Sequence, residues 1–83
     1  MAEVMGNPVA SKGNYTGNAN DMLNNGIYYN NNSSIANLPN SYGTLIVFKS
    51  AAHIVQIYMR ADSVTALYAR QRNSGTWSDW KEL

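Results

Sequence analysis

Short apolar segments with very short connections dominate the second half of this 83-residue chain. Residues 44–49 form a nearly continuous apolar run, which is typical of a strand covered on both faces. Residues 53–60 alternate, with Val55, Ile57 and Met59 on one face and Ile54, Gln56, Tyr58 and Arg60 on the other. Because only Ser50, Ala51 and Ala52 separate the two segments, we expect an antiparallel β-hairpin.

Three further strands are expected, over residues 26–29, 64–72 and 76–83. The first is followed by a polar loop, 30–40, in which Pro39 cannot donate to a ladder. A turn at 61–63 leads into the second. Asn73, Ser74 and Gly75 form a three-residue turn into the third, with the glycine available for a left-handed conformation.

The first quarter of the chain has weaker patterning. Residues 18–25 are the one helical candidate, with Asn20 as its cap and Gly26 at its end. Glycine and proline break every period in residues 1–17, which we interpret as an N-terminal extension or linker, leaving 18–83 as the domain. The sequence therefore predicts a mainly β fold, a small antiparallel sheet or sandwich-like domain with one short N-terminal helix.

Composition narrows the functional classes. There is no cysteine and one histidine, so we expect neither disulfides nor a metal site, and we expect no cofactor. A core this small is marginal on its own, which favours association with copies of itself or with a larger partner. The formal charge is +1 without a basic stripe, so nucleic-acid binding is not expected. Membrane insertion and a secretion signal are not expected either, and we expect a soluble protein made in the cytoplasm.

The C-terminal third carries the candidate binding residues. Alternation places Tyr68, Arg70 and Arg72 on one face, and it places Trp77 and Trp80 on opposite faces of an extended segment. An indole can stack on a sugar ring, and a guanidinium can grip a carboxylate or phosphate. Tyrosines supply broad contact area at low entropic cost. The predicted ligand-binding residues are Trp80, Trp77, Arg72, Arg70, Tyr68, Tyr58 and Tyr42.

A structural role is the alternative for each of these side chains. The indoles can fill the core, and the arginines can pack across the sheet or pair with acidic residues. Catalysis is not expected, because His53 lacks a nucleophile motif and the carboxylates are few and scattered. Those carboxylates are Glu3, Asp21, Asp62, Asp79 and Glu82.

Several short motifs follow one another in a familiar order. They are Asn20-Asp21-Met22-Leu23, Gly26-Ile27-Tyr28, Asn37-Leu38-Pro39, Tyr42 to Val47, Val55-Gln56 with Tyr58, Tyr68-Ala69-Arg70 and Gly75 to Lys81. Taken together, residues 18–83 resemble the knob domain found at the C-termini of phage tail fibres and R-type pyocin fibres, the pyocin knob. Each motif alone is weak, whereas the series at these spacings is specific.

The resemblance implies a fibre-tip module of a virion or phage-tail-like particle, made in the host bacterial cytoplasm and assembled as a homotrimer. It implies contact with a bacterial surface polysaccharide or envelope protein, and with fibre shaft or baseplate proteins. Residues 1–17 would then be shaft-proximal. The expected function is host cell attachment by multivalent carbohydrate binding. Two alternatives remain: a trimerisation and folding cap without a ligand, and an accessory carbohydrate-binding module of a depolymerase.

Overall fold

A computed structural model describes residues 11–61 and 66–83 of the chain. Within them the fold is mainly β, as predicted, and no helix is long and apolar enough to cross a membrane. The elements in chain order are β1 (Ser11–Asn14), β2 (Gly17–Asn18), the 3₁₀ turn η1 (Ala19–Asp21), β3 (Gly26–Asn30), β4 (Ile35–Ala36), β5 (Gly43–Ser50), β6 (His53–Arg60), β7 (Leu67–Asn73), β8 (Thr76–Trp77) and β9 (Lys81–Glu82).

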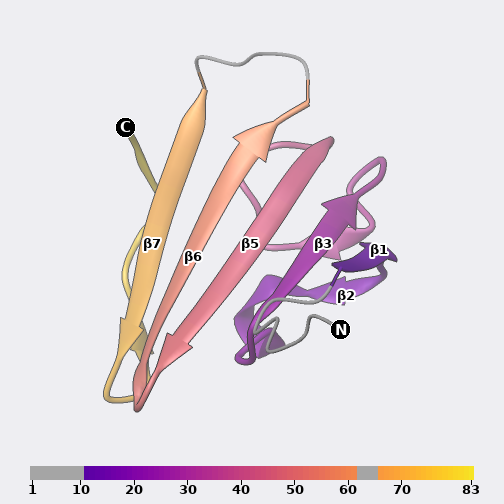
Figure 1. Cartoon of the computed structure of the whole chain (residues 1–83). Coiled ribbons are helices and arrows are strands. Elements are labelled where there is room, and N and C mark those ends of the chain that lie inside the picture. Colours follow the sequence, from indigo (N-terminus) through magenta and orange to yellow (C-terminus); the bar gives the residue numbers. More distant parts are fainter. Residues whose placement is uncertain (1–10, 62–65) are drawn as a thin grey trace.

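One twisted sheet organises the domain (Figure 1). Its strand order is β1-β3-β5-β6-β7-β8, and β9 also pairs with β7. The four long strands β3, β5, β6 and β7 are antiparallel neighbours, whereas β1 runs parallel to β3. A separate parallel pair joins β2 to β4. The predicted antiparallel pairing is therefore correct for the long strands and for β8 and β9, which pair antiparallel with β7. It is wrong for β1, β2 and β4, whose partners lie further along the chain and are reached by connections long enough for parallel pairing.

The tight turns confirm two predicted hairpins. Ser50 pairs with His53 across Ala51 and Ala52, so 44–49 and 53–60 form the expected β5–β6 hairpin. Asn73 pairs with Thr76, which makes the next turn a two-residue loop rather than the predicted three-residue loop. Both loop residues have positive φ, 54° at Ser74 and 84° at Gly75, the combination that matches the right-handed twist of the flanking strands.

Three other predictions concern boundaries. The final strand expected over 76–83 is interrupted, because only β8 and β9 pair with β7. The expected turn at 61–63 and the start of the strand at 64 lie largely outside the described residues, as do residues 1–10 of the expected extension. The described part of the expected N-terminal extension includes β1, which is hydrogen-bonded to β3. The predicted domain boundary between residues 17 and 18 stays a prediction.

The predicted helix over 18–25 is wrong. Only one 3₁₀ turn forms, and its cap is Asn18, whose side chain accepts a hydrogen bond from the Asn20 N–H at 2.9 Å. The reason lies in a distant strand. The Gln56 side-chain amide donates to the carbonyls of Ala19 at 2.7 Å and Met22 at 3.0 Å, so this buried amide fixes a tight turn where sequence alone allowed a helix.

The core lies on one face of the sheet, between that face and the segment that runs from β2 to β5. Its buried members are Ala19, Met22, Tyr28, Ile35, Leu45, Val47, Ile54 and Tyr58. In β6 the alternation is as predicted, and the buried face is the one with Ile54, Gln56 and Tyr58. In β5 burial also alternates, so the prediction that 44–49 is covered on both faces is wrong for the single chain.

The opposite side of the sheet, called the outer face below, is covered less completely. It comprises Ile27, Tyr29, Thr44, Ile46, Phe48, Val55, Ile57, Met59, Leu67 and Ala69. Phe48 is 44% exposed and Met59 41% exposed, and the other eight are partly buried. Apolar side chains thus occupy both faces of the central strands, but the described residues bury only one face.

The start of β5 tests how closely the core is packed. A Cβ atom on buried Gly43 would lie 2.4 Å from the Met59 carbonyl oxygen and 2.6 Å from the Tyr58 ring. Backbone cannot yield as a flexible side chain does, so we expect Gly43→Ala to lower the free energy of unfolding by about 2–3 kcal/mol. Urea denaturation followed by tryptophan fluorescence measures the change.

Gly13→Ala is the control for that substitution. Nothing lies within 4 Å of a Cβ atom on Gly13, and only its φ of 61° disfavours a side chain. We expect a cost of about 1 kcal/mol there. Equal costs at the two glycines would contradict the packing described for the β5–β6 pair.

Candidate binding surface

Arg70 is one of the predicted ligand-binding residues, and its side chain lies in the interior. It projects from β7 with 8% of its surface exposed. Its Nε donates to Gln56 Oε1 at 2.8 Å. The guanidinium carbon lies 4.0 Å from the centre of the Trp77 ring and 4.8 Å from that of Trp80. We call Arg70, Gln56, Trp77 and Trp80 the Arg70 cluster.

The electrostatics of this cluster are unusual, because its cation is buried. Within the described residues, the Arg70 Nη2 atom has no hydrogen-bond partner. Burial lowers the pKa of the Arg70 guanidinium to about 10, so the side chain is still cationic at neutral pH. The Gln56 side-chain carbonyl oxygen and the negative faces of the two indole rings therefore compensate this charge, the rings at distances where cation–π attraction is effective.

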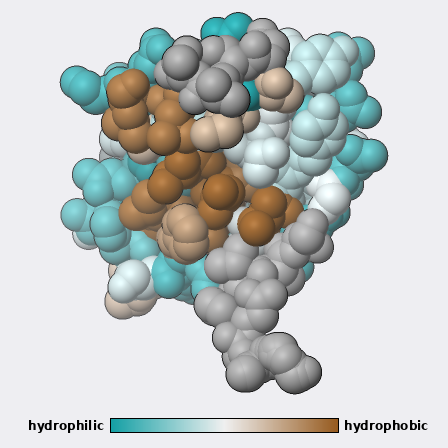
Figure 2. Space-filling model, turned by 45° about the horizontal axis from the view of Figure 1, so that its top comes forward, coloured by the Kyte–Doolittle hydropathy of each residue, from teal (hydrophilic) through white to brown (hydrophobic). Residues whose placement is uncertain are grey.

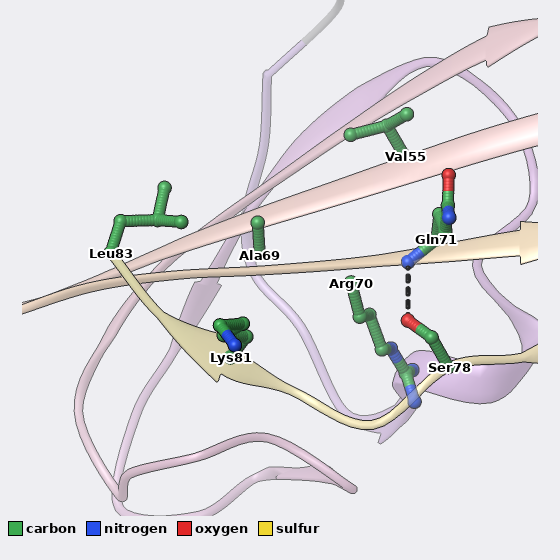
Figure 3. A pocket seen from close by; sticks show the side chains of 7 residues that line it. All are labelled: Val55, Ala69, Arg70, Gln71, Ser78, Lys81 and Leu83. Atoms are coloured by element: carbon green, nitrogen blue, oxygen red, sulfur yellow. Dashed lines mark hydrogen bonds between the residues drawn. The ribbon is translucent and has the colours of Figure 1, made fainter.

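A bulge at the sheet edge brings the two indoles together. Arg72 pairs with Trp77 and Ala69 pairs with Lys81, so two residues on β7 face three residues, 78–80, on the edge segment. The extra residue shifts the alternation and turns both indoles toward Arg70. The prediction that Trp77 and Trp80 occupy opposite faces is therefore wrong. Ser78 fixes the bulge, because its N–H donates to the Gln71 carbonyl at 2.8 Å. Its Oγ accepts from the Gln71 N–H at 3.0 Å, the bond drawn as a dashed line in Figure 3.

Both indoles are anchored at their polar edge. The Trp77 Nε1–H donates to the Asn20 carbonyl at 3.3 Å, and the Trp80 Nε1–H donates to the Asn37 carbonyl at 2.9 Å. Both rings are partly buried against the core. The side chains of Asn20 and Asn37 are exposed, and Asn37 Nδ2 donates to Asn18 Oδ1 at 2.8 Å. We call Trp77, Trp80, Asn18, Asn20 and Asn37 the amide–indole surface.

The other predicted site residues lie in different environments. Tyr58 is fully buried, its hydroxyl donates to the Asn40 carbonyl at 3.1 Å, and its ring lies 6.4 Å from Trp80. It therefore belongs to the core and presents no surface to a ligand. Tyr68 and Arg72 are partly buried on the same face of β7 as Arg70. Tyr42, in the segment leading into β5, is 44% exposed.

Two buried amides hold this region, and neither was predicted from the sequence. Gln56 joins Arg70 to the η1 turn, as described above. Asn30 is also fully buried: its Nδ2 donates to the Asn40 carbonyl at 2.9 Å, and its Oδ1 accepts from the Ile35 N–H at 2.9 Å. A signal for Gln56 was present, since it falls between Ile54 and Tyr58 on one face of an alternating strand. Asn30 has no such signal, because it is one of many asparagines.

A shallow pocket lies beside the cluster, at the edge of the outer face. Val55, Ala69, Arg70, Gln71, Ser78, Lys81 and Leu83 line it. Figure 3 shows the Arg70 guanidinium directed away from Val55 and Gln71. The pocket is thus apolar at Val55, Ala69 and Leu83, with polar side chains around them. In residues 11–61 and 66–83 there is no group of three or more His, Cys, Asp or Glu residues that could hold a metal ion.

Comparison with known proteins identifies the family. A family model, the XkdV N-terminal domain, matches residues 4–83. The chain therefore belongs to the XkdV N-terminal domain family and is a phage tail fibre-related, tail-associated domain. No curated protein matches.

A solved structure of the R2 pyocin fibre of P. aeruginosa, comprising C-terminal residues of that fibre, is similar to this chain. The two share 28% sequence identity with a TM-score of 0.72, and the similarity covers 89% of this chain. The chain spans 21% of the length of that fibre structure. These findings confirm the predicted relationship to phage and pyocin fibres. The narrower knob assignment stays a prediction.

The Arg70 cluster yields a stability test. Arg70→Ala leaves the Gln56 Oε1 atom without its donor and leaves a space between the indoles, so we expect the free energy of unfolding to fall by about 2–4 kcal/mol. Arg72→Ala, two residues along the same strand and less buried, should cost less than about 1 kcal/mol. Urea denaturation of both variants gives the comparison. Similar costs for the two would show that Arg70 has no special structural role.

Proposed function

We propose that this chain is a knob-type tip domain of a tail fibre, which attaches a phage or phage-tail-like particle to a bacterial surface glycan. The observation that carries the proposal is the similarity to the R2 pyocin fibre over 89% of the chain, at 28% identity. Membership of a tail fibre-related family supports it. Partners of the chain would be surface polysaccharide or envelope protein on one side and fibre shaft or baseplate proteins on the other.

The amide–indole surface is the part of the chain best suited to a glycan. Its indoles are partly exposed, and the exposed amides of Asn20 and Asn37 can donate to and accept from sugar hydroxyls. Arg72, partly exposed on the neighbouring strand, adds a cation for acidic sugars. Arg70 and Tyr58 would act indirectly, by holding the indoles from below.

The proposed role is binding without chemistry. Among the described residues, Asp21, Asp79 and Glu82 have exposed side chains; Asp21 lies in η1, and the other two lie in the C-terminal segment from β8 to β9. A glycosidase needs two carboxyl groups facing each other across the scissile bond. Nothing in the described geometry assembles such a pair, so we place this chain with adhesion modules.

Affinity would come from repetition. A single shallow surface makes few contacts, and linking several copies raises the overall avidity without any new contact. In our proposal three chains form a homotrimeric tip, and several fibres act together on one particle. The rival candidate is a trimerisation and folding cap with no ligand of its own. The partly exposed apolar outer face favours that candidate, because it fits self-association rather than sugar binding.

Binding to purified bacterial surface polysaccharides tests the proposal. The chain is biotinylated and displayed on streptavidin, so that its valency does not depend on its own association. We expect binding to at least one acidic polysaccharide, and we expect Arg72→Ala to weaken it about tenfold or more, as loss of a hydrogen bond to a charged group does.

Lys12→Ala is the matched control. It removes the same charge from β1, which lies at the other edge of the sheet from β7, and should leave binding unchanged. An equal loss of polysaccharide binding for Lys12→Ala would show that the effect of Arg72→Ala comes from net charge and not from the position of Arg72. Absence of binding across a broad polysaccharide panel would favour the folding cap.

A further inference from the structure

The outer face has a regular arrangement that the core does not explain. Its middle row crosses four strands in register, from Ile27 to Ile46, Ile57 and Ala69. A second row contains Tyr29, Thr44, Met59 and Leu67, and a third contains Phe48 and Val55. None of the ten residues is charged. Figure 2 shows hydrophobic side chains gathered into one area of the molecular surface.

The composition of β5 indicates that this face is covered in the functional protein. A strand with apolar side chains on both faces is typical of a sheet buried on both sides, whereas a sheet with one face in water alternates apolar and polar residues. In β5 the outer side chains include Ile46 and Phe48, and Phe48 is 44% exposed. On β6 the outer side chains are His53 at the start of the strand and then Val55, Ile57 and Met59, which are apolar.

The size of the face is in the range of an interface core. Four strands about 4.8 Å apart, each contributing about five residues at 3.3 Å, make roughly 300 Å² of sheet. This is in the range of the largest apolar patch on a typical monomer, about 300–600 Å², and such a patch is often functional. A standard interface buries about 800 Å² per partner, so this face fits its apolar centre and needs a polar rim. Gln71 beside Val55 and Lys81 beside Ala69 begin such a rim.

We propose that the outer face is the surface by which copies of this chain pack against one another. The proposal deepens the homotrimer of the proposed function and rests on it, by assigning the residues of the contact. An uncharged apolar face is complementary to a second copy of itself, because packing buries no charge that needs a partner. In a ring of three copies the contact is heterologous, so the outer face of each copy would turn toward the threefold axis and pack against both neighbours.

The pocket at the edge of the outer face can accept a protruding side chain of another copy. Phe48 pairs with Val55, and Val55 lines the pocket with Ala69 and Leu83. Leu83 is 69% exposed and its N–H donates to the Leu67 carbonyl at 2.8 Å, so it extends the apolar area beyond β7. In a closed ring of copies, Phe48 of one chain would approach this pocket of the next chain.

Sedimentation equilibrium of the 83-residue chain, from micromolar to millimolar concentration, tests this assignment. We expect the wild-type chain to self-associate. Phe48→Lys and Met59→Lys should each raise the dissociation constant at least about tenfold, because an ammonium group buried without a partner is costly. Asn24→Lys adds the same charge at an exposed position between η1 and β3, and should leave association unchanged. Phe48→Leu should retain it.

Three outcomes would overturn the proposal: a monomer at every concentration, association unaffected by both lysine variants, or equal weakening by Asn24→Lys. Circular dichroism confirms that each variant keeps its sheet, which is expected since Phe48 and Met59 are each more than 40% exposed. A measurement on the wild type needs no variant. In a mixture of isotope-labelled and unlabelled chains, intermolecular NOEs should involve Ile57 and Met59; NOEs confined to the amide–indole surface would contradict the assignment.

These results separate this inference from the proposed function. Glycan binding is measured on streptavidin-displayed chains, whose valency is imposed from outside. A chain that associates through the outer face but binds no polysaccharide retains the inference and loses the adhesion proposal. A chain that binds polysaccharide but stays monomeric supports the adhesion proposal and contradicts the assignment of the outer face as the contact between copies.

Discussion

Arg70, a buried arginine that has no acidic partner among residues 11–61 and 66–83, is the constraint around which this small domain is arranged. Arg70 enters the interior from β7 and meets a side-chain amide and two indole faces. Each of these groups is tied to another part of the chain. Gln56 binds the carbonyls of the η1 turn, and the indole N–H groups bind carbonyls of Asn20 and Asn37. One cation thereby links the C-terminal edge of the sheet to the segment that covers the core.

This arrangement separates structural from exposed parts of the candidate site. The inner sides of Trp77 and Trp80 serve the core, and a partly exposed portion of each remains beside exposed asparagine side chains. A rigid aromatic platform costs little entropy when it meets a ligand. The outer face is on the other side of the sheet, so adhesion and self-association would use different surfaces. That division is what a repeated adhesion module requires.

The strands could be predicted from the sequence because their signals are local. Alternation in 53–60 and the short connection at Ala51 and Ala52 determine the β5–β6 hairpin. The η1 region was mispredicted because the group that shapes it, Gln56, is more than thirty positions away. No period reports such a contact. For the same reason, sequence alternation identified the two faces of β6 but did not show which face is buried.

The arrangement of the candidate site could be predicted only in part, for a related reason. The aromatic and cationic composition of the C-terminal third singled out Arg70, Trp77 and Trp80 as ligand-binding residues, a role that stays a prediction, but it did not indicate that the three side chains pack together. Strict alternation failed at the bulge, where residues 78–80 face only two residues of β7, and the indoles therefore share a side. Tyr58 was selected by composition, but its full burial depends on the fold of the 30–42 region.

A double-mutant cycle on Arg70 and Trp80 measures the central interaction most directly. The cycle uses the free energies of unfolding of the wild type, Arg70→Met, Trp80→Leu and the double variant. We expect a favourable coupling of about 1–2 kcal/mol, since the cation lies 4.8 Å from the ring centre in a desolvated site. A coupling energy near zero would contradict it, because the indole would then be filling space without stabilising the charge.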